Sequence, residues 1–126
     1  MKAREEIIEN YIAGYNEMNI EKMTKDLDDS IVFKNVSNEI VDLEIDGLDS
    51  FKQQATDAIG LFSEREQTIT AIRHQNGAVE VDISYCAVLA KDFSEDLQKG
   101  QKVHLNGTSV FTFNKDNKIT SLTDIS

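Results

Sequence analysis

The stretch IRHQNGAVEVDISYCAVL, residues 72–89, decides the fold of this chain. At its centre, Asn76-Gly77 is a strong signal for a two-residue hairpin turn, because both residue types accept the positive φ angles that such a turn requires. After the turn, apolar residues alternate with polar residues from Val79 to Leu89. This period of two is typical of a strand with one buried face. The stretch therefore predicts an antiparallel hairpin.

The turn also fixes which residues face each other. Counting outward from it pairs Arg73 with Glu80 on the face that we expect to meet solvent. The opposite face carries the following pairs: Ile72 with Val81, Thr70 with Ile83, and His74 with Val79. The charged pair faces out and the apolar pairs face in, so the turn and the hydrophobic pattern agree.

A second hairpin is predicted at the end of the chain. Residues 103–113 alternate in the same way and are followed by a turn at Lys115-Asp116-Asn117, with Asn117 left-handed. The predicted pairs are Phe113 with Ile119, Phe111 with Ser121, Ser109 with Thr123, and, on the outer face, Val110 with Leu122. An apolar pair on the outer face indicates a homodimer formed through the sheet face. The alternative is a scattered apolar pair on the surface.

Three amphipathic helices are expected. The first is a helix of about 16 residues, with apolar side chains at three- and four-residue spacing: Ile7, Ile8, Tyr11, Ile12, Tyr15 and Met18. Asn19 is expected to cap a short second helix that runs through Met23 to Leu27. A third helix is expected from about Leu48 to Phe62.

Two short strands, residues 31–33 and 40–43, complete the order of elements: helix, helix, two strands, helix, four strands. Long strands that are joined by tight turns twist and curl, and their apolar face has to be covered. The order predicts a single α+β domain over residues 1–126, in which the three helices pack in the concave face of a cone-like, curved antiparallel sheet.

Composition limits the function. The chain has 13 basic and 23 acidic residues and a net charge of −10, which disfavours nucleic acids and membrane surfaces as partners. Cys86 is the only cysteine, and no apolar stretch resembles a signal peptide or a transmembrane segment of about 20 residues. We therefore expect a cytoplasmic protein.

No cofactor or metal is expected. The glycines form no phosphate-binding loop or dinucleotide motif. The acidic residues between 39 and 49 could form a cation site or a solvated loop and edge strand. They lack the glycine and the alternating oxygen ligands of a calcium loop, so the second interpretation is favoured.

Three motifs occur in a suggestive order: Tyr11-Ile12 in the first helix, DDSIVF at residues 28–33, and FTFNKDNKI at residues 111–119. Together with the order of elements, they resemble the nuclear transport factor 2-like superfamily, and within it the SnoaL-like group, which includes relatives of polyketide cyclases and ketosteroid isomerases. The resemblance implies a cystatin-like cone fold and a dimer formed through the sheet. Members include enzymes that act on small hydrophobic substrates, binding domains and adaptors, so the fold alone does not fix the function.

Ketosteroid isomerase chemistry needs a tyrosine hydroxyl, a carboxylate base and a protonated carboxylic acid. By the resemblance, the tyrosine falls on Tyr11, the base on Lys34 or Asn35, and the acid on Ser109. Neither acidic position holds a carboxyl group, so we expect this mechanism to be absent. Lys34 could act as a base if burial depressed its pKa, but a solvated lysine is the simpler interpretation.

The two histidines are expected on opposite faces of the sheet, which disfavours a metal site formed by the pair. His74 faces in, near the end of the hairpin, and is either a general base or a solvated histidine at the rim. Tyr11 and His74 are therefore the weak candidates for catalytic residues.

Aromatic and polar side chains are expected to converge inside the cone: Tyr11, Tyr15, Phe33, Asn35, Phe62, Thr70, Tyr85, Ser109 and Phe111. They either fill the core or line a pocket for a small organic ligand, and the tyrosine hydroxyls, which need partners, favour a partly wet pocket. We expect a domain that binds a small molecule without assured catalysis. The alternatives are an isomerase, dehydratase or cyclase on a small hydrophobic substrate, and a dimeric protein-interaction module.

Overall fold

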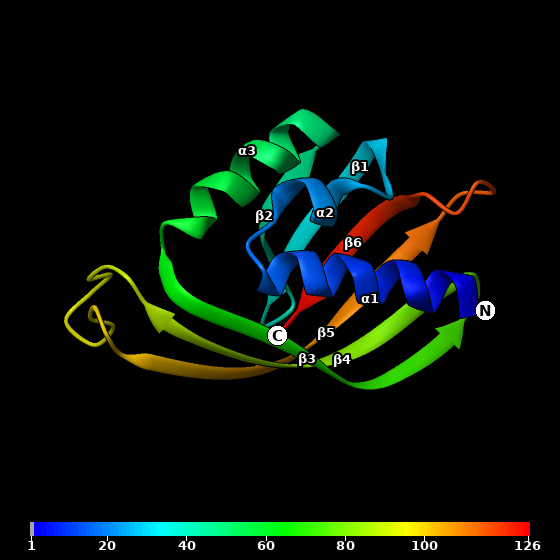
Figure 1. Cartoon of the computed structure of the whole chain (residues 1–126). Helices are drawn as coiled ribbons and strands as arrows, with labels where there is room; N and C mark the ends of the chain where they lie inside the picture. The colour runs from blue at the N-terminus through cyan, green and yellow to red at the C-terminus, as the bar shows by residue number, and fades with distance from the viewer. Residues whose placement is uncertain (1) are drawn as a thin grey trace.

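Helices and strands occur in the predicted order in the computed structural model (Figure 1). It describes residues 2–126, so Met1, the first residue of the expected domain, lies outside the described residues. The helices are α1 (Lys2–Asn16), α2 (Ile20–Thr24) and α3 (Leu48–Ile59). The strands are β1 (Leu27–Ser37), β2 (Ile40–Asp46), β3 (Phe62–Gln75), β4 (Ala78–Leu89), β5 (Lys102–Phe113) and β6 (Ile119–Ile125). The α+β class is confirmed.

All six strands form one sheet, in the order β2-β1-β6-β5-β4-β3. Neighbouring strands are antiparallel except for β1 and β6, which run parallel. The sheet curls, and the three helices lie on its hollow side, as Figure 1 shows. This arrangement confirms the predicted cone, with β6 as a central strand.

The helices follow their apolar spacing. Ile8, Tyr11 and Ile12 are buried on one side of α1, and the Asn19 side chain caps α2 by accepting a hydrogen bond from the Lys22 backbone N–H at 3.1 Å. Both later helices end earlier than predicted. Leu27 is instead the first residue of β1 and Phe62 the first residue of β3, because both pair with neighbouring strands.

The core lies between α1 and the middle of the sheet. Its largest fully buried side chains are Phe111, Ile8, Ile31, Ile119, Leu122, Val79 and Val81. Among helices composed of residues 2–126, none is long and apolar enough to cross a membrane. The acidic run lies on the exposed edge strand β2 and its flanks, and no metal-binding group of three or more acidic, histidine or cysteine side chains is found within residues 2–126.

The β3–β4 hairpin confirms most of its predicted register. Arg73 lies opposite Glu80, and the inner pairs of Ile72 with Val81 and His74 with Val79 are present. The pairing of Thr70 with Ile83 is wrong, because a bulge between Ile69 and Ala71 places Ile69 opposite Ile83. Thr70 is consequently exposed, and its hydroxyl donates to the Asp82 carbonyl at 3.3 Å.

The β5–β6 hairpin departs from its predicted register by one residue. Asn117 is left-handed (φ 60°) and Phe113 pairs with Ile119, as expected. An irregularity after this pair then shifts the register, and the observed pairs are Thr112 with Ser121, Phe111 with Leu122, Val110 with Thr123 and Ser109 with Asp124. The predicted pairs beyond Phe113 are therefore wrong.

This shift places the Leu122 side chain in the core, where it is 1% exposed. The outer apolar pair of Val110 with Leu122 does not form, so the homodimer remains a prediction that rests on the family resemblance alone. The same shift brings the Asp124 carboxyl to the concave side of the sheet, where it meets Ser109.

Candidate functional site

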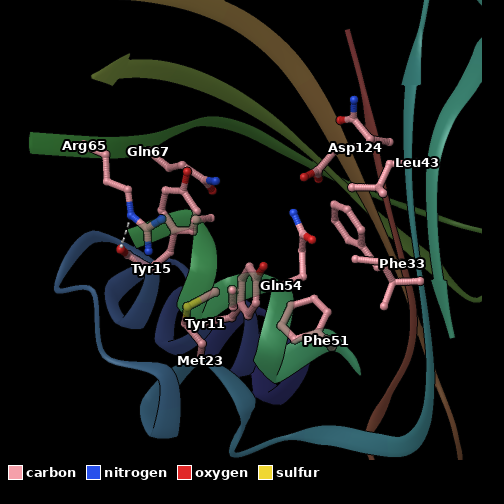
Figure 2. A pocket seen from close by; sticks show the side chains of 14 residues that line it. Tyr11, Tyr15, Met23, Phe33, Leu43, Phe51, Gln54, Arg65, Gln67 and Asp124 are labelled. Atoms are coloured by element: carbon pink, nitrogen blue, oxygen red, sulfur yellow. Dashed lines mark hydrogen bonds between the residues drawn. The ribbon is translucent and has the colours of Figure 1, made fainter. Parts of the chain in front are cut away.

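A cavity of about 220 Å³ lies between the helices and the concave face of the sheet (Figure 2). The helices and the residues next to them contribute Tyr11, Tyr15, Met23, Phe51, Gln54, Ala55 and Ala58 to its wall. The strands contribute Phe33, Asn35, Leu43, Ile45, Arg65, Gln67 and Asp124. Its wall is therefore mainly apolar, with polar groups from both layers, such as Gln54 from α3 and Asp124 from β6, which is the usual composition of a small-molecule site.

A second cavity of about 380 Å³ adjoins the first along β5 and the end of β6. Its wall includes the polar groups of Ser37, Asn106, Thr108 and Ser109, together with Tyr85. Four side chains line both cavities: Tyr15, Asn35, Gln67 and Asp124. These four side chains stand where the two cavities meet, so a molecule that extends from one cavity into the other passes them.

Asp124 is the acidic group of the site. Ser109 donates its hydroxyl hydrogen to Asp124 Oδ1 at 2.7 Å, and Figure 2 shows the carboxyl group directed into the first cavity. Burial raises the pKa of Asp124 to about 6, although the hydrogen bond from Ser109 acts in the opposite direction. A carboxyl group with this pKa exchanges protons readily near neutral pH, as a general acid or base must.

Tyr11 points its hydroxyl into the same cavity (Figure 2), and its ring packs edge to face with the Phe111 ring, with centroids 5.8 Å apart. Burial raises the pKa of Tyr11 well above its usual value, and the negative charge of Asp124 adds to the rise. The hydroxyl therefore stays protonated. Within residues 2–126 it has no hydrogen-bond partner, although the side chain is only 7% exposed. A bound molecule can therefore accept a hydrogen bond from it.

Tyr15 and Tyr85 form a pair on the other side of the site. The Tyr15 hydroxyl lies 3.0 Å from the Tyr85 hydroxyl, and the rings meet edge to face at 6.1 Å. Burial raises the pKa of both residues, so both remain neutral. The pair therefore forms an uncharged part of the wall.

Arg65 is buried beside Tyr15. Its Nε donates to the Tyr15 carbonyl at 3.1 Å, and its guanidinium group lies 3.8 Å from the centroid of the Tyr15 ring. Asn16 ties the end of α1 to the same strand, by accepting from the Gln67 backbone N–H at 2.7 Å and donating to the Gln67 carbonyl at 3.0 Å. These bonds hold Arg65 and Gln67 against the helix.

The structure brings together part of the predicted pocket. Tyr11, Tyr15, Phe33 and Asn35 line the first cavity, and Tyr85 and Ser109 line the second. Three predicted residues line neither cavity. Phe111 is fully buried in the core, Phe62 packs against the Tyr85 ring at 6.2 Å, and Thr70 is displaced to the surface by the bulge.

The remaining candidates for acid–base chemistry lie elsewhere. His74 faces the helix layer as predicted, but its Nε2 lies 2.9 Å from Glu5 Oε2 at the rim, and it lines neither cavity. Lys34 pairs with Glu44 at 3.9 Å and is also outside both cavities. The geometry therefore supports the solvated interpretation of both residues.

Sequence reasoning missed the polar residues that matter most here, namely Asp124, Arg65 and Gln67. The positions that the resemblance gives to the two isomerase acids hold no carboxyl group, but Asp124 brings one into the pocket from another position. A signal for Asp124 does exist in the sequence. Ile119 and Leu122 are both apolar but are three residues apart, which breaks the period of two and indicates a bulge between them. Once Leu122 faces in, Asp124 must face in too.

A hollow, curved sheet that holds three helices is the fold of solved structures described as cystatin-fold and NTF2-like proteins. The family model described as the SnoaL-like domain matches residues 8–122. The chain belongs to this family. No curated protein is similar to it in sequence.

Solved structures with the same fold have different roles. A protein from Xanthomonas campestris assigned as a polyketide cyclase is 14% identical (TM-score 0.82, 99% of this chain and 90% of that chain). An uncharacterized cystatin-fold protein from Novosphingobium aromaticivorans is 15% identical (TM-score 0.79, 98% and 97%). An epoxide hydrolase from M. tuberculosis is 17% identical (TM-score 0.74, 95% and 79%). At these identities the likeness is one of fold.

Proposed function

We propose that the two cavities bind a small, mainly apolar organic molecule and that Asp124 moves a proton on it. This would make the protein an acid–base enzyme of the isomerase, dehydratase or cyclase type. The observation that carries the proposal is the position of the Asp124 carboxyl: it lies at the junction of two cavities, with Ser109 as its single hydrogen-bond partner within residues 2–126.

The proposed reaction is proton abstraction from a carbon atom next to a carbonyl group. The Asp124 carboxylate takes the proton, the C–H bond breaks, and its electron pair moves onto the carbonyl oxygen as an enolate. The Tyr11 hydroxyl, which has no protein partner among residues 2–126, donates a hydrogen bond to that oxygen. Asp124 then returns the proton to the same or another carbon atom.

Two further observations support the proposal. The apolar wall of the first cavity suits a hydrophobic substrate and weakens the competition of water for the charged groups. In addition, a polyketide cyclase assignment and an epoxide hydrolase occur among proteins of this fold, and both names describe enzymes that act on small organic molecules.

Deuterium exchange tests the proposal with 2-tetralone, an apolar ketone with acidic hydrogens next to its carbonyl group. Proton NMR in D₂O measures the loss of these hydrogens, and shifts of the protein amides measure binding. The wild-type protein should accelerate exchange, and Asp124→Asn should lower the rate by at least about a hundredfold, because the amide cannot accept the proton. Asp96→Asn, in the exposed loop after β4, is the matched control and should exchange at the wild-type rate.

The rate should also rise with pH as Asp124 loses its proton, with a midpoint near its pKa of about 6. An Asp124→Asn variant that exchanges as fast as the wild type would exclude Asp124 as the base. A wild-type protein that binds 2-tetralone without exchanging its hydrogens would contradict the enzymatic part and leave a binding domain.

A further inference from the structure

We propose that Arg65 binds an acidic group of the ligand, so that the molecule held in this site is a small organic acid with a carboxylate at one end. The inference adds a substrate class to the proposed function. It rests on the proposed function in one respect: the same two cavities must bind a ligand.

The first observation is a buried positive charge without a counterion. Arg65 is 6% exposed, yet none of the ion pairs found within residues 2–126 involves it. A buried charge is costly unless a group of opposite sign accompanies it. The stacking of the guanidinium group on Tyr15 offsets part of this cost, but it supplies no negative charge.

The second observation is the set of unused donors. The Tyr15 carbonyl and ring hold the guanidinium group through its Nε and its face. Neither Nη1 nor Nη2 makes a hydrogen bond within residues 2–126, and Nη2 is enclosed so that water does not reach it. Nη1 is not enclosed in this way, so a carboxylate oxygen of a ligand in the first cavity can accept a charge-assisted hydrogen bond from it.

Asp124 does not fill this role. No oxygen of Asp124 lies within 4.0 Å of an Arg65 nitrogen, and its hydrogen bond goes to Ser109. Both charges act on Tyr11, because Asp124 raises its pKa and Arg65 lowers it. The site thus has a cationic side at Arg65 and an acid–base side at Asp124, with the Tyr11 hydroxyl under the influence of both. A ligand whose carboxylate meets Arg65 is oriented with its apolar part towards the first cavity and its reacting carbon atom towards Asp124.

The overall charge of the protein supports this inference. At a net charge of −10, the protein repels anions at long range. A preference for an acid over its neutral amide must therefore arise from a local group, and Arg65 is the one cationic side chain on the wall of either of the two cavities, counted within residues 2–126.

The test compares acids with their amides in three pairs: phenylacetate, 3-phenylpropionate and 4-phenylbutyrate, each against the corresponding amide. Amide NMR titrations at pH 7.5 give the dissociation constants. At least one acid should bind about tenfold more tightly than its amide, and Arg65→Gln should reduce the affinity of that acid to that of the amide. Lys34→Gln removes a cation outside both cavities and should keep the preference.

One readout needs no variant. In the wild-type protein, the Arg65 side-chain N–H resonances should shift on addition of the acid and stay in place with the amide, so the test holds even if Arg65→Gln does not fold. Equal affinity of every acid and its amide for the wild-type protein would overturn the inference, and so would a folded Arg65→Gln variant that keeps the preference.

Asp124→Asn separates this inference from the proposed function. The variant should keep the preference for the acid, because Arg65 is unchanged. Loss of deuterium exchange with retained acid preference supports both proposals. If the wild-type protein shows Asp124-dependent exchange but no preference for any acid, only the role of Arg65 is overturned. If the wild-type protein prefers an acid but does not catalyse exchange, only the role of Asp124 is overturned.

Discussion

Burial removes water from the Asp124 carboxyl, and one hydrogen bond from Ser109 compensates for only part of the lost hydration. Burial penalises the charged form, so the folded protein holds its proton more tightly than the unfolded chain does. The pKa is about 6 in the folded state against an ordinary value of 3.8. A residue tuned in this way is useful for proton transfer, and it also affects stability.

The sign of that effect follows from proton binding. Between pH 4 and 6 the folded state binds more protons at Asp124 than the unfolded state does, so the contribution of this residue is fully present below pH 4 and is lost as the pH rises through about 6. A difference of about two pKa units corresponds to a loss on the order of 3 kcal/mol. We expect the wild-type protein to lose this stability, relative to Asp124→Asn, between pH 4 and 7.

Urea unfolding of both proteins at several pH values measures this difference, and all other titrating groups cancel in the comparison. Asp96→Asn, an exposed substitution, should follow the wild-type curve. If the difference between wild type and Asp124→Asn does not change with pH, Asp124 titrates normally and the proposed base loses its support.

At the level of strands, the sequence indicates which elements form more clearly than where their register shifts. The alternation and the Asn76-Gly77 turn predict the first hairpin correctly as far as Ile72, where its register is still fixed by the turn. The bulge at Thr70 and the irregularity before Ser121 each insert one residue, and one inserted residue reverses the face of every side chain beyond it. A register counted from the turn alone therefore places Leu122, and with it Asp124 two residues further on, on the wrong face. The β preference of these residues does not correct the error, because both faces are compatible with β structure. Only the three-residue spacing of Ile119 and Leu122 indicates the bulge.

The contact between α1 and α2 provides a prediction at the same scale. A Cβ atom on Gly14 would lie 2.6 Å from the Met23 backbone nitrogen. The two helices can therefore approach this closely only because Gly14 has no side chain. Gly14→Ala should destabilise the protein by about 1–3 kcal/mol, because the clash involves backbone atoms that cannot rotate away. This loss should occur although alanine favours a helix by about 1 kcal/mol over glycine.

Gly60→Ala is the matched substitution at the end of α3. Its Cβ atom would lie 3.8 Å from the Asp57 carbonyl oxygen, an ordinary contact, and its backbone is right-handed. The free energy of unfolding in urea should therefore change little. A Gly14→Ala variant as stable as Gly60→Ala would show that the two helices can separate at no cost.

For the molecule as a whole, the hollow follows from a mismatch in size between its two layers. Six strands about 4.8 Å apart form a sheet about 24 Å wide, and strands of 12 to 14 residues run for about 40 to 46 Å. The helices are about 10 Å thick, and α1 and α3, with 15 and 12 residues, are about 22 and 18 Å long. They cannot cover the whole concave face, so part of it stays open.

The sequence predicts this architecture because the apolar spacing and the order of elements are visible along the chain. The polar lining is less visible, since Arg65 and Gln67 lie in the polar stretch SEREQT at residues 63–68, which is typical of an exposed strand. Only the arrangement in space shows that α1 covers these two residues through Tyr15 and Asn16. The site is therefore a property of the packed layers more than of any one motif.

If the hollow is kept open for a ligand, filling it should stabilise the protein and abolish binding. Ala58 on α3 lines the first cavity, so Ala58→Leu should raise the free energy of unfolding by about 0.5–2 kcal/mol through added apolar burial. The same variant should weaken the binding of 3-phenylpropionate and of 2-tetralone at least tenfold. Ala3→Leu adds the same group to the exposed start of α1 and should change neither property. Urea unfolding and NMR titration measure both effects, and an Ala58→Leu variant that binds like the wild type would place the ligand outside the first cavity.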